Sequence, residues 1–192
     1  MRIVGGQFRG RPLAAPAHAG TRPTSDRVRE AIFNVLAHGV ADFALKGARV
    51  LDLFAGTGAL GLEALSRGAA FCLFVEHEAQ ARALTRRNIE ALGLTGVTKL
   101  FRRDATGLGP AGRNGGFSLA FLDPPYGHGL AERSLASAAE GGWLAPDAIV
   151  VVEERKGTPP SLPAGYAAFD RRTWGDTQAL FARFTGAGPI GR

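Results

Sequence analysis

The sequence predicts an α/β fold with a Rossmann-like sheet that carries helices on both faces. Three observations support this class. Short apolar runs alternate with helical patterns from about residue 47 onward, a glycine-rich turn follows the first of these runs, and two β-like runs close the chain. Continuous apolar strands separated by helices are typical of a parallel sheet that is buried on both sides. The length of 192 residues suits one domain of ordinary size.

The first 25 residues are predicted to form a basic arm. Glycines and prolines interrupt this stretch, and no helical period appears in it. Residues 2–4 and 7–9 are expected to pair as a short hairpin across the two glycines between them. The chain is therefore expected to divide into an arm over residues 1–25, a folded domain over 26–186 and a tail over 187–192.

Strands and helices are predicted to alternate through the folded domain. An apolar stripe at helical spacing from Val28 to Leu36 predicts a first helix, which Thr24 and Ser25 would cap and Gly39 would end. The predicted strands cover residues 49–54, 71–75, 98–101, 118–122 and 148–152, and the predicted helices cover 59–67, 78–92 and 130–140, with a loop at 107–116. Two further β-like runs, at 166–173 and 178–184, flank a turn at 174–177 and predict a C-terminal β-hairpin, which makes seven strands.

The charge of the chain is concentrated near its N-terminus. The net charge is +6, from 23 basic and 17 acidic side chains, and arginine outnumbers lysine 20 to 3. Guanidinium groups hold phosphates and stack on bases, so clustered arginines indicate a polyanionic partner. A GC-rich genome would also enrich arginine, and the overall bias does not separate these explanations. The clustering favours nucleic acid, and the candidate binding residues are Arg2, Arg9, Arg11, Arg22, Arg27 and Arg29.

Several classes of protein are disfavoured by composition. The longest aliphatic run, residues 148–152, is far shorter than the roughly 20 residues of a membrane span. The N-terminus has no apolar segment of the kind found in secretory signals. One cysteine excludes internal disulfides, and the four histidines lie too far apart in sequence to suggest a metal site. We therefore expect a soluble, cytoplasmic protein without a metal.

The first candidate site is the glycine-rich turn after the first strand. Gly56, Gly58 and Gly61 satisfy the pattern G-x-G-x-x-G, and Glu76 follows 20 residues after Gly56, where an acid can bind ribose hydroxyls. Both features suit a dinucleotide or S-adenosylmethionine. Asp52 favours the latter, because its carboxylate could meet the ammonium of a methionine moiety. The expected cofactor-binding residues here are Asp52, Phe54, Gly56, Gly58, Leu60 and Glu76. The alternative is a glycine turn that only packs a strand on a helix.

A second cofactor contact is expected after the third strand. The carboxylate of Asp104 could accept a hydrogen bond from an adenine amine, while the backbone N–H of Ala105 offers a donor. The alternative for Asp104 is a cap of a helix or turn.

The third site is the sequence Asp123-Pro124-Pro125-Tyr126, which closes the fourth strand. The exocyclic amine of a base is a poor nucleophile, because its lone pair is conjugated into the ring. The carboxylate of Asp123 and a backbone carbonyl near Pro124 could accept both N–H groups and draw the nitrogen toward sp³ geometry. The prolines fix the backbone and lack competing donors, and Tyr126 offers a face on which a splayed base can stack. In-line positioning then suffices for methyl transfer. A plain Asp-Pro-Pro turn is the alternative.

Three segments together resemble one family. The Asp-Pro-Pro-Tyr sequence at 123–126 is similar to the signature of methyltransferases that act on exocyclic or amide nitrogens. The segments RIVGGQFRGR at 2–11, RPTSDRVRE at 22–30 and LFAGTGALGLEALSRG at 53–68 look like the RsmD family. The resemblance covers nearly the whole chain. It implies a class I S-adenosylmethionine-dependent methyltransferase fold, with residues 26–186 as the methyltransferase domain.

The resemblance also implies a reaction and a partner. The RsmD family methylates the exocyclic N2 of a guanine in 16S rRNA, at position 966 in the customary rRNA numbering. Residues 22–29 would border the active site and contact RNA or shape the cofactor pocket. The implied cofactor is S-adenosyl-L-methionine, and the implied partner is 16S rRNA in the small ribosomal subunit or an assembly intermediate. A monomer suffices for this task, and no membrane partner is expected.

Three other functions share some of these sequence features. A methyltransferase for adenine N6 in DNA or for a glutamine amide would use a similar Pro-Pro loop, although a sequence-specific DNA enzyme would usually need a recognition region as well. A non-catalytic RNA-binding module would not require four acids around one pocket. A nicotinamide dehydrogenase would have no use for the Asp-Pro-Pro-Tyr loop. The sequence assigns no role to Trp143, Trp174 or His128.

Overall fold

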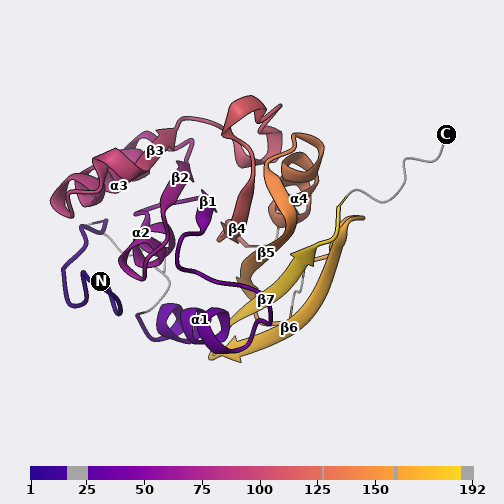
Figure 1. The fold of residues 1–192 in the computed structure, drawn as a ribbon, viewed down its shortest axis with the longest axis horizontal. Helices are drawn as coiled ribbons and strands as arrows, with labels where there is room; N and C mark the ends of the chain where they lie inside the picture. Colours follow the sequence, from indigo (N-terminus) through magenta and orange to yellow (C-terminus); the bar gives the residue numbers. More distant parts are fainter. Residues whose placement is uncertain (17–25, 127, 158–159, 187–192) are drawn as a thin grey trace. The chain divides into compact units, whose positions relative to one another are not determined.

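The computed structural model describes residues 1–16, 26–126, 128–157 and 160–186. Seven strands form a mixed sheet in the order β3-β2-β1-β4-β5-β7-β6 (Figure 1). This confirms the predicted seven-stranded α/β sheet with a C-terminal hairpin. The chain divides into two compact units, Met1–Arg102 and Arg103–Arg192. The expected tail at 187–192 and the expected caps Thr24 and Ser25 lie outside the described residues.

The first unit contains three parallel strands and three helices. In chain order these are α1 (Asp26–His38), β1 (Arg49–Leu53), α2 (Ala59–Ser66), β2 (Phe71–Val75), α3 (Ala79–Ala91) and β3 (Thr98–Phe101), with a short 3-10 turn, η1 (Thr95–Val97), before β3. Strand β2 pairs with both β1 and β3. Helix α2 packs against β1 and β2, and every residue in it is buried, as expected of a helix that is apolar around most of its circumference.

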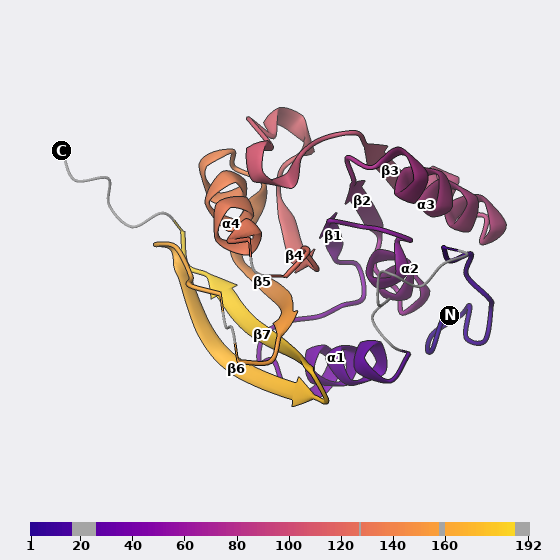
Figure 2. The ribbon, with the colours of Figure 1, turned by 180° about the vertical axis from the view of Figure 1, so that it is seen from behind.

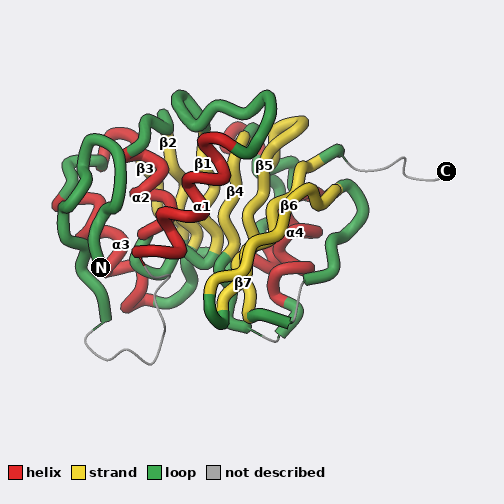
Figure 3. Tube along the Cα trace, turned by 90° about the horizontal axis from the view of Figure 1, so that it is seen from below, coloured by secondary structure: helices red, strands yellow, loops and turns green. Residues whose placement is uncertain are grey.

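The second unit contains the remaining four strands. Its elements are η2 (Ala105–Gly107), η3 (Gly112–Asn114), β4 (Phe117–Leu122), α4 (Leu130–Glu140), β5 (Leu144–Arg155), β6 (Tyr166–Trp174) and β7 (Thr177–Phe184). Strands β4 and β5 are parallel, whereas β7 runs antiparallel to both β5 and β6. Figures 2 and 3 show the long β6–β7 hairpin beside β5. Trp143 belongs to the core of this unit, where it stacks on Phe117 and donates a hydrogen bond to the Gly109 carbonyl at 2.7 Å.

Strand β5 is much longer than the predicted strand at 148–152. Its polar end, Glu153–Arg155, pairs with Thr177–Ala179 of β7, so the ladder continues past the apolar run that was visible in the sequence. At its other end, Asp147 adopts a left-handed φ of 60°. Such local features interrupt the apolar pattern without ending the strand. The remaining predicted strands and helices agree with the structure to within about two residues.

The predicted hairpin of the N-terminal arm has the wrong pairing partner. Residues 2–4 do not pair with 7–9. Instead, Arg2 forms an antiparallel bridge with Pro12, and the N–H of Ile3 donates to the carbonyl of Arg11 at 2.9 Å. Residues 7–9 are engaged elsewhere, because the backbone N–H groups of Gln7 and Phe8 donate to Ser66 in α2. Residues 1–16 of the arm therefore form a wider loop that rests on α2.

Gly6 lies where the arm meets α2. Its φ is +74°, and a Cβ added there would lie 1.9 Å from the carbonyl oxygen of Ser66. Only glycine allows this close approach of the two backbones.

Among the helices of the described residues, each is too short or too polar to span a lipid bilayer.

Candidate active site

The glycine loop between β1 and α2 has a left-handed backbone at three positions. Gly56 and Gly58 have φ values of 58° and 78°, and Phe54 has a φ of 59°. Glycine adopts this conformation without cost, but a phenylalanine there stores backbone strain of about 1–3 kcal/mol. Such strain is typical of functional loops, and the surrounding structure must hold it.

Side chains from β2 and α3 hold this loop. The backbone N–H of Gly56 donates to Glu76 Oε2 at 2.9 Å, and the Gly56 carbonyl accepts from Thr85 Oγ1 at 2.7 Å. The Thr57 carbonyl accepts from Asn88 Nδ2 at 2.9 Å. Thr85 and Asn88 were not found by the sequence analysis. The only signal for them is their polarity on the buried side of α3.

Asp52 lies beneath the glycine loop, at the end of β1. It is almost fully buried, and its Oδ2 accepts a hydrogen bond from the backbone N–H of Gly61 at 2.9 Å. A Cβ at Gly61 would lie 2.4 Å from Phe74 Cε1 and 2.5 Å from Cys72 Sγ, so the third glycine is required for close packing. Burial, and to a lesser extent the charge of Asp52, raises the pKa of Cys72 well above its usual value.

Glu76 lies directly after β2, at one side of the glycine loop. Besides binding Gly56, it accepts a hydrogen bond from the N–H of Glu78 at 2.9 Å through Oε1. Leu60 is buried in the first turn of α2. Two carboxylates at the ends of adjacent strands, on either side of a glycine cradle, suit a cofactor that carries hydroxyl and ammonium groups. The six residues expected in this part of the cofactor site therefore lie within one unit.

Asp104 and Ala105 belong to the second unit, whereas those six residues belong to the first. Asp104 Oδ1 accepts hydrogen bonds from the backbone N–H and the hydroxyl of Thr106, both at 2.8 Å. Asp104 therefore caps η2, which was the alternative weighed for it. Ala105 is buried. A contact of these two residues with adenine stays a prediction.

The Asp-Pro-Pro-Tyr loop follows β4 in the second unit. Pro124 is buried, Asp123 is half-buried, and Pro125 and Tyr126 are exposed. Burial raises the pKa of Tyr126, the negative charges of Asp123 and Glu153 raise it further, and a hydrogen bond with Thr177 acts in the opposite direction. Those effects place the phenol close to Asp123 and to the ends of β5 and β7.

Glu153 and Thr177 are neighbours of this loop that the sequence analysis missed. Both are buried. Thr177 begins β7 directly after the turn at Gly175, whose φ is 60°. Its contact with Tyr126 depends on the hairpin folding back along β5, and no local sequence signal shows that. Within the described segments, no group of three His, Cys, Asp or Glu side chains could hold a metal ion.

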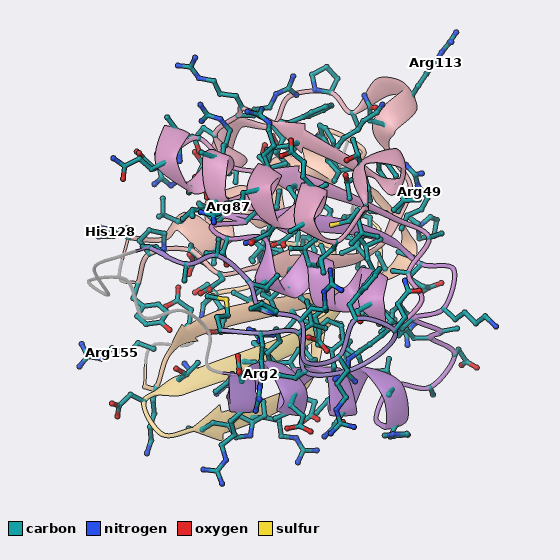
Figure 4. All side chains as sticks on the ribbon, turned by 90° about the vertical axis from the view of Figure 1, so that its left-hand side faces the viewer. Arg2, Arg49, Arg87, Arg113, His128 and Arg155 are labelled. Atoms are coloured by element: carbon teal, nitrogen blue, oxygen red, sulfur yellow. The ribbon has the colours of Figure 1, made fainter. Side chains whose placement is uncertain are left out.

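The basic arm contributes to a hollow of about 460 Å³ beside α1. Its lining includes the exposed arginines Arg2, Arg9 and Arg27, together with Asp26 and Glu30. Figure 4 shows Arg2 next to α1. Three basic side chains around one concavity suit a phosphate backbone.

The other three candidate arginines lie in different surroundings. Arg11 is exposed and donates to the carbonyl of Ala91 at 3.3 Å. Arg22 lies outside the described residues. His128, which the sequence left unassigned, is exposed in the second unit (Figure 4).

Arg29 is a structural residue, and its expected role in RNA binding is wrong. Its side chain is fully buried, so it cannot contact a phosphate. It forms an ion pair with Asp26 at 2.7 Å, lies 3.6 Å from Glu63 Oε2, and donates to the carbonyl of Arg2. A buried arginine needs such partners, and here they join α1, α2 and the arm.

Asp26 makes the stability of this region depend on pH. Burial opposes its ionisation, but the hydrogen bond and charge of Arg29 outweigh burial and lower the pKa of Asp26 below 3.8. A carboxylate with a lowered folded-state pKa stabilises the protein above its unfolded pKa, and this contribution is lost as the pH falls through the folded value. We therefore expect the free energy of unfolding to fall below about pH 4 more steeply in the wild type than in Asp26→Asn.

Urea denaturation at several pH values between 6 and 3 tests this expectation. The difference between the two proteins should be modest, because the Asp26 side chain is 36% exposed and water screens its charge. Parallel pH profiles for the two proteins would contradict the prediction.

Comparisons with known proteins show close relatives. A family model described as "Conserved hypothetical protein 95" matches residues 1–183. "Ribosomal RNA small subunit methyltransferase D" of Escherichia coli is 40% identical over 170 residues, which cover 87% of this chain and 81% of that protein. The protein of the same name from Haemophilus influenzae is 33% identical over 177 residues, which cover 91% of this chain and 89% of the relative.

A solved structure is similar over nearly its whole length. The structure of "Putative methyltransferase yhhF" from Escherichia coli matches with a TM-score of 0.81 at 33% identity. The match covers 98% of this chain and 99% of that one. The fold described above is therefore that of a methyltransferase-like α/β protein.

Proposed function

This chain belongs to the RsmD family of ribosomal RNA small subunit methyltransferases, and from that premise we propose that it methylates the exocyclic N2 of a guanine in 16S rRNA. The family resemblance implies position 966 as the target. The methyl donor is S-adenosyl-L-methionine. In the reaction an N–C bond forms on the base as the S–C bond of the donor breaks, and the amine gives up one proton.

The glycine loop of the first unit supplies the cofactor site in this proposal. Gly56 and Gly58 supply the left-handed turns that bring the loop backbone to the cofactor, Glu76 binds ribose hydroxyls, and Asp52 faces the methionine ammonium. The strained backbone of the loop supports this role, because residues held in strained conformations cluster at ligand-binding sites. Phe54 and Leu60 complete the apolar part of the site, and Asp104 and Ala105 would contact the adenine.

The observation that carries the catalytic part of the proposal is the exposure of Tyr126 beside Asp123. Tyr126 is 38% exposed, so part of its ring is open to a partner. An exposed ring is available to stack on an unpaired base. The half-buried Asp123 carboxylate can accept from the guanine amine, with a carbonyl near Pro124 as the second acceptor. Pro125 keeps the loop rigid and free of a competing donor.

Transfer of a labelled methyl group from S-adenosylmethionine tests this proposal. The acceptors are unmethylated small ribosomal subunits, naked 16S rRNA, tRNA and duplex DNA, followed by nucleoside analysis. The proposal expects N2-methylguanosine in the RNA of the small subunit or in naked 16S rRNA. Label on tRNA or DNA alone would overturn the target, and no transfer to any acceptor would overturn the activity.

The hollow lined by Arg2, Arg9 and Arg27 is proposed to bind the RNA backbone. We expect Arg27→Ala to weaken 16S rRNA binding and to lower the magnitude of its salt slope by about one, because one phosphate contact and its released counterion are lost. The measurement is the dissociation constant between 50 and 200 mM salt. The matched control is Arg113→Ala, which removes an arginine that projects away from η3 (Figure 4). An unchanged slope in Arg27→Ala would assign that arginine a different role.

The proposal also covers the form of the substrate, the oligomeric state and the roles of the chain segments. The substrate is 16S rRNA within the small subunit or an assembly intermediate, and the enzyme acts as a monomer in the cytoplasm. Residues 1–25 serve as the RNA-binding arm, residues 26–186 as the methyltransferase domain and residues 187–192 as a tail.

A further inference from the structure

Helix α3 carries two buried polar side chains one turn apart. Thr85 and Asn88 are 0% and 2% exposed, although most of α3 is polar and accessible. A residue pair at i, i+3 shares one face of a helix. Buried polar groups are retained only where they are hydrogen-bonded, so the partners of this pair identify what the helix holds.

Among the described residues, the Thr85 hydroxyl is hydrogen-bonded only to the glycine loop and to its own helix. Its hydroxyl lies 2.7 Å from the Gly56 carbonyl and 3.1 Å from the Ala81 carbonyl. Asn88 differs, because it binds two separate segments. Its Nδ2 donates to the Thr57 carbonyl at 2.9 Å and to the Ala14 carbonyl at 3.1 Å.

The third bond of Asn88 also goes to the arm. Oδ1 accepts from the backbone N–H of Ala14 at 2.7 Å. Both amide hydrogens and one acceptor position are therefore in use. The reversed amide orientation would place Oδ1 against two carbonyl oxygens, so only one orientation satisfies the site. Moving the Thr57 carbonyl disturbs the same amide group that holds Ala14.

We propose that Asn88 is a positioning residue that couples the glycine loop to the N-terminal arm, so that the cofactor and RNA strengthen each other's binding. This inference rests on the proposed function, in which the loop binds S-adenosylmethionine and the arm binds RNA. Cofactor binding fixes the loop, the fixed Thr57 carbonyl holds the Asn88 amide, and the amide holds Ala14. By thermodynamic linkage, RNA on the arm favours cofactor binding by the same factor.

One further attachment of the arm and one attachment of the glycine loop provide matched controls. Ser66 Oγ donates to the Gly5 carbonyl at 2.6 Å and accepts from the Phe8 N–H at 3.0 Å. Ser66→Ala therefore weakens the arm without touching the loop. Thr85→Val weakens the loop without touching the arm. Of Ser66, Thr85 and Asn88, Asn88 alone contacts both the loop and the arm. The loop also reaches the arm directly, because the Thr57 hydroxyl lies 3.6 Å from Met1 Sδ, and that contact is present in all of these variants.

Amide hydrogen exchange of the arm, measured on the full chain without RNA, tests the coupling. We expect saturating S-adenosylmethionine to slow exchange at Ala14 by about 5-fold or more in the wild type, the lower end of typical coupling. In Asn88→Ala the cofactor should still bind, but the ratio of exchange rates with and without cofactor should fall below about 2-fold. Ser66→Ala and Thr85→Val should keep the wild-type ratio, even where their absolute rates change.

Asn88→Leu is the second variant, because the alanine variant leaves a cavity as well as removing three hydrogen bonds, and a thermal melt could show it unfolded. The leucine nearly keeps the size of the side chain, but it has neither the donors nor the acceptor of the amide. It should therefore lose the coupling as well. The affinity for 16S rRNA, measured with and without S-adenosylhomocysteine, should show the same pattern of ratios across the variants.

The outcomes separate the two levels of the proposal. A wild-type ratio of one with normal cofactor binding, or a wild-type ratio preserved in both Asn88 variants, overturns the coupling and leaves the proposed function intact. A wild type that does not bind S-adenosylmethionine overturns the proposed function and the coupling together.

Discussion

Replacing Asp123 with alanine is expected to lower kcat for methyl transfer by about 10²–10³-fold, the range for loss of one hydrogen-bonding group that stabilises charge developing in the transition state. The guanine amine becomes nucleophilic only when acceptors hold its N–H groups and its lone pair leaves the ring. Asp123 supplies the charged acceptor, and a backbone carbonyl cannot replace it. Because Asp123 is not among the residues proposed to bind S-adenosylmethionine, the affinity for the cofactor should fall only slightly.

A graded series sharpens this prediction. Asp123→Asn keeps an acceptor oxygen but loses the charge, so its loss of kcat should be intermediate. Asp170→Ala removes a carboxylate from β6 of the same unit, where it is hydrogen-bonded to Arg172, and should leave kcat near the wild-type value. Single-turnover kinetics with saturating cofactor would show the order. Near-normal turnover in Asp123→Ala would contradict the proposed role of Asp123 in orienting the guanine amine.

Replacing Glu63 with alanine is expected to lower the free energy of unfolding by about 3–5 kcal/mol, which is typical when one partner of a buried ion pair is removed. Glu63 is fully buried and accepts from the Val4 N–H at 2.8 Å and from Arg67 Nε at 2.7 Å. It also lies 3.6 Å from Arg29 Nε. Its removal leaves a buried guanidinium with less compensating charge and releases one anchor of the arm.

Two comparisons test the cause of that loss. Arg67→Ala should cost less, because Arg67 is partly exposed and Glu63 keeps its contacts with Val4 and Arg29. The double variant Arg29→Met/Glu63→Leu should recover part of the stability lost in Glu63→Ala, because no buried charge remains without its partner. Urea denaturation gives the free energies. A double variant less stable than Glu63→Ala would show that packing, rather than charge, dominates at this site.

The alternation of strands and helices was predictable because apolar runs and glycine turns are local signals. The strand at 98–101 was predicted to the residue. The length of β5 was not predictable, since its polar end is a strand only because β7 pairs with it. The pairing of the arm failed for a similar reason. Ser66 competes for the backbone of residues 7 and 8, and its position over the arm is a property of the tertiary structure.

Arg29 was predicted to bind RNA from its charge alone, and charge does not show whether a side chain is buried. Its position in the helix put it near the polar boundary, but Glu63, 34 residues later, draws it into the core. The same limit explains why Thr85 and Asn88 were overlooked. Their role depends on carbonyl groups of the glycine loop and the arm, which no spacing rule in the sequence places near α3. The glycine loop and the Asp-Pro-Pro-Tyr loop were found because their residues are contiguous.

The single cysteine can report on local unfolding of the sheet, because it reacts only when the protein around it opens. Cys72 lies in β2 with no exposed surface, against the place where any side chain at Gly61 would intrude. Only the thiolate reacts with alkylating reagents, and both the burial of this thiol and its raised pKa suppress that form. The rate of alkylation of Cys72 therefore reports the frequency of the opening motions that expose the sheet beneath the glycine loop. If a second cysteine were introduced on the surface, a thiol-reactive dye would label it in the native protein and leave the buried Cys72 unlabelled. Cys72 would therefore not have to be replaced first.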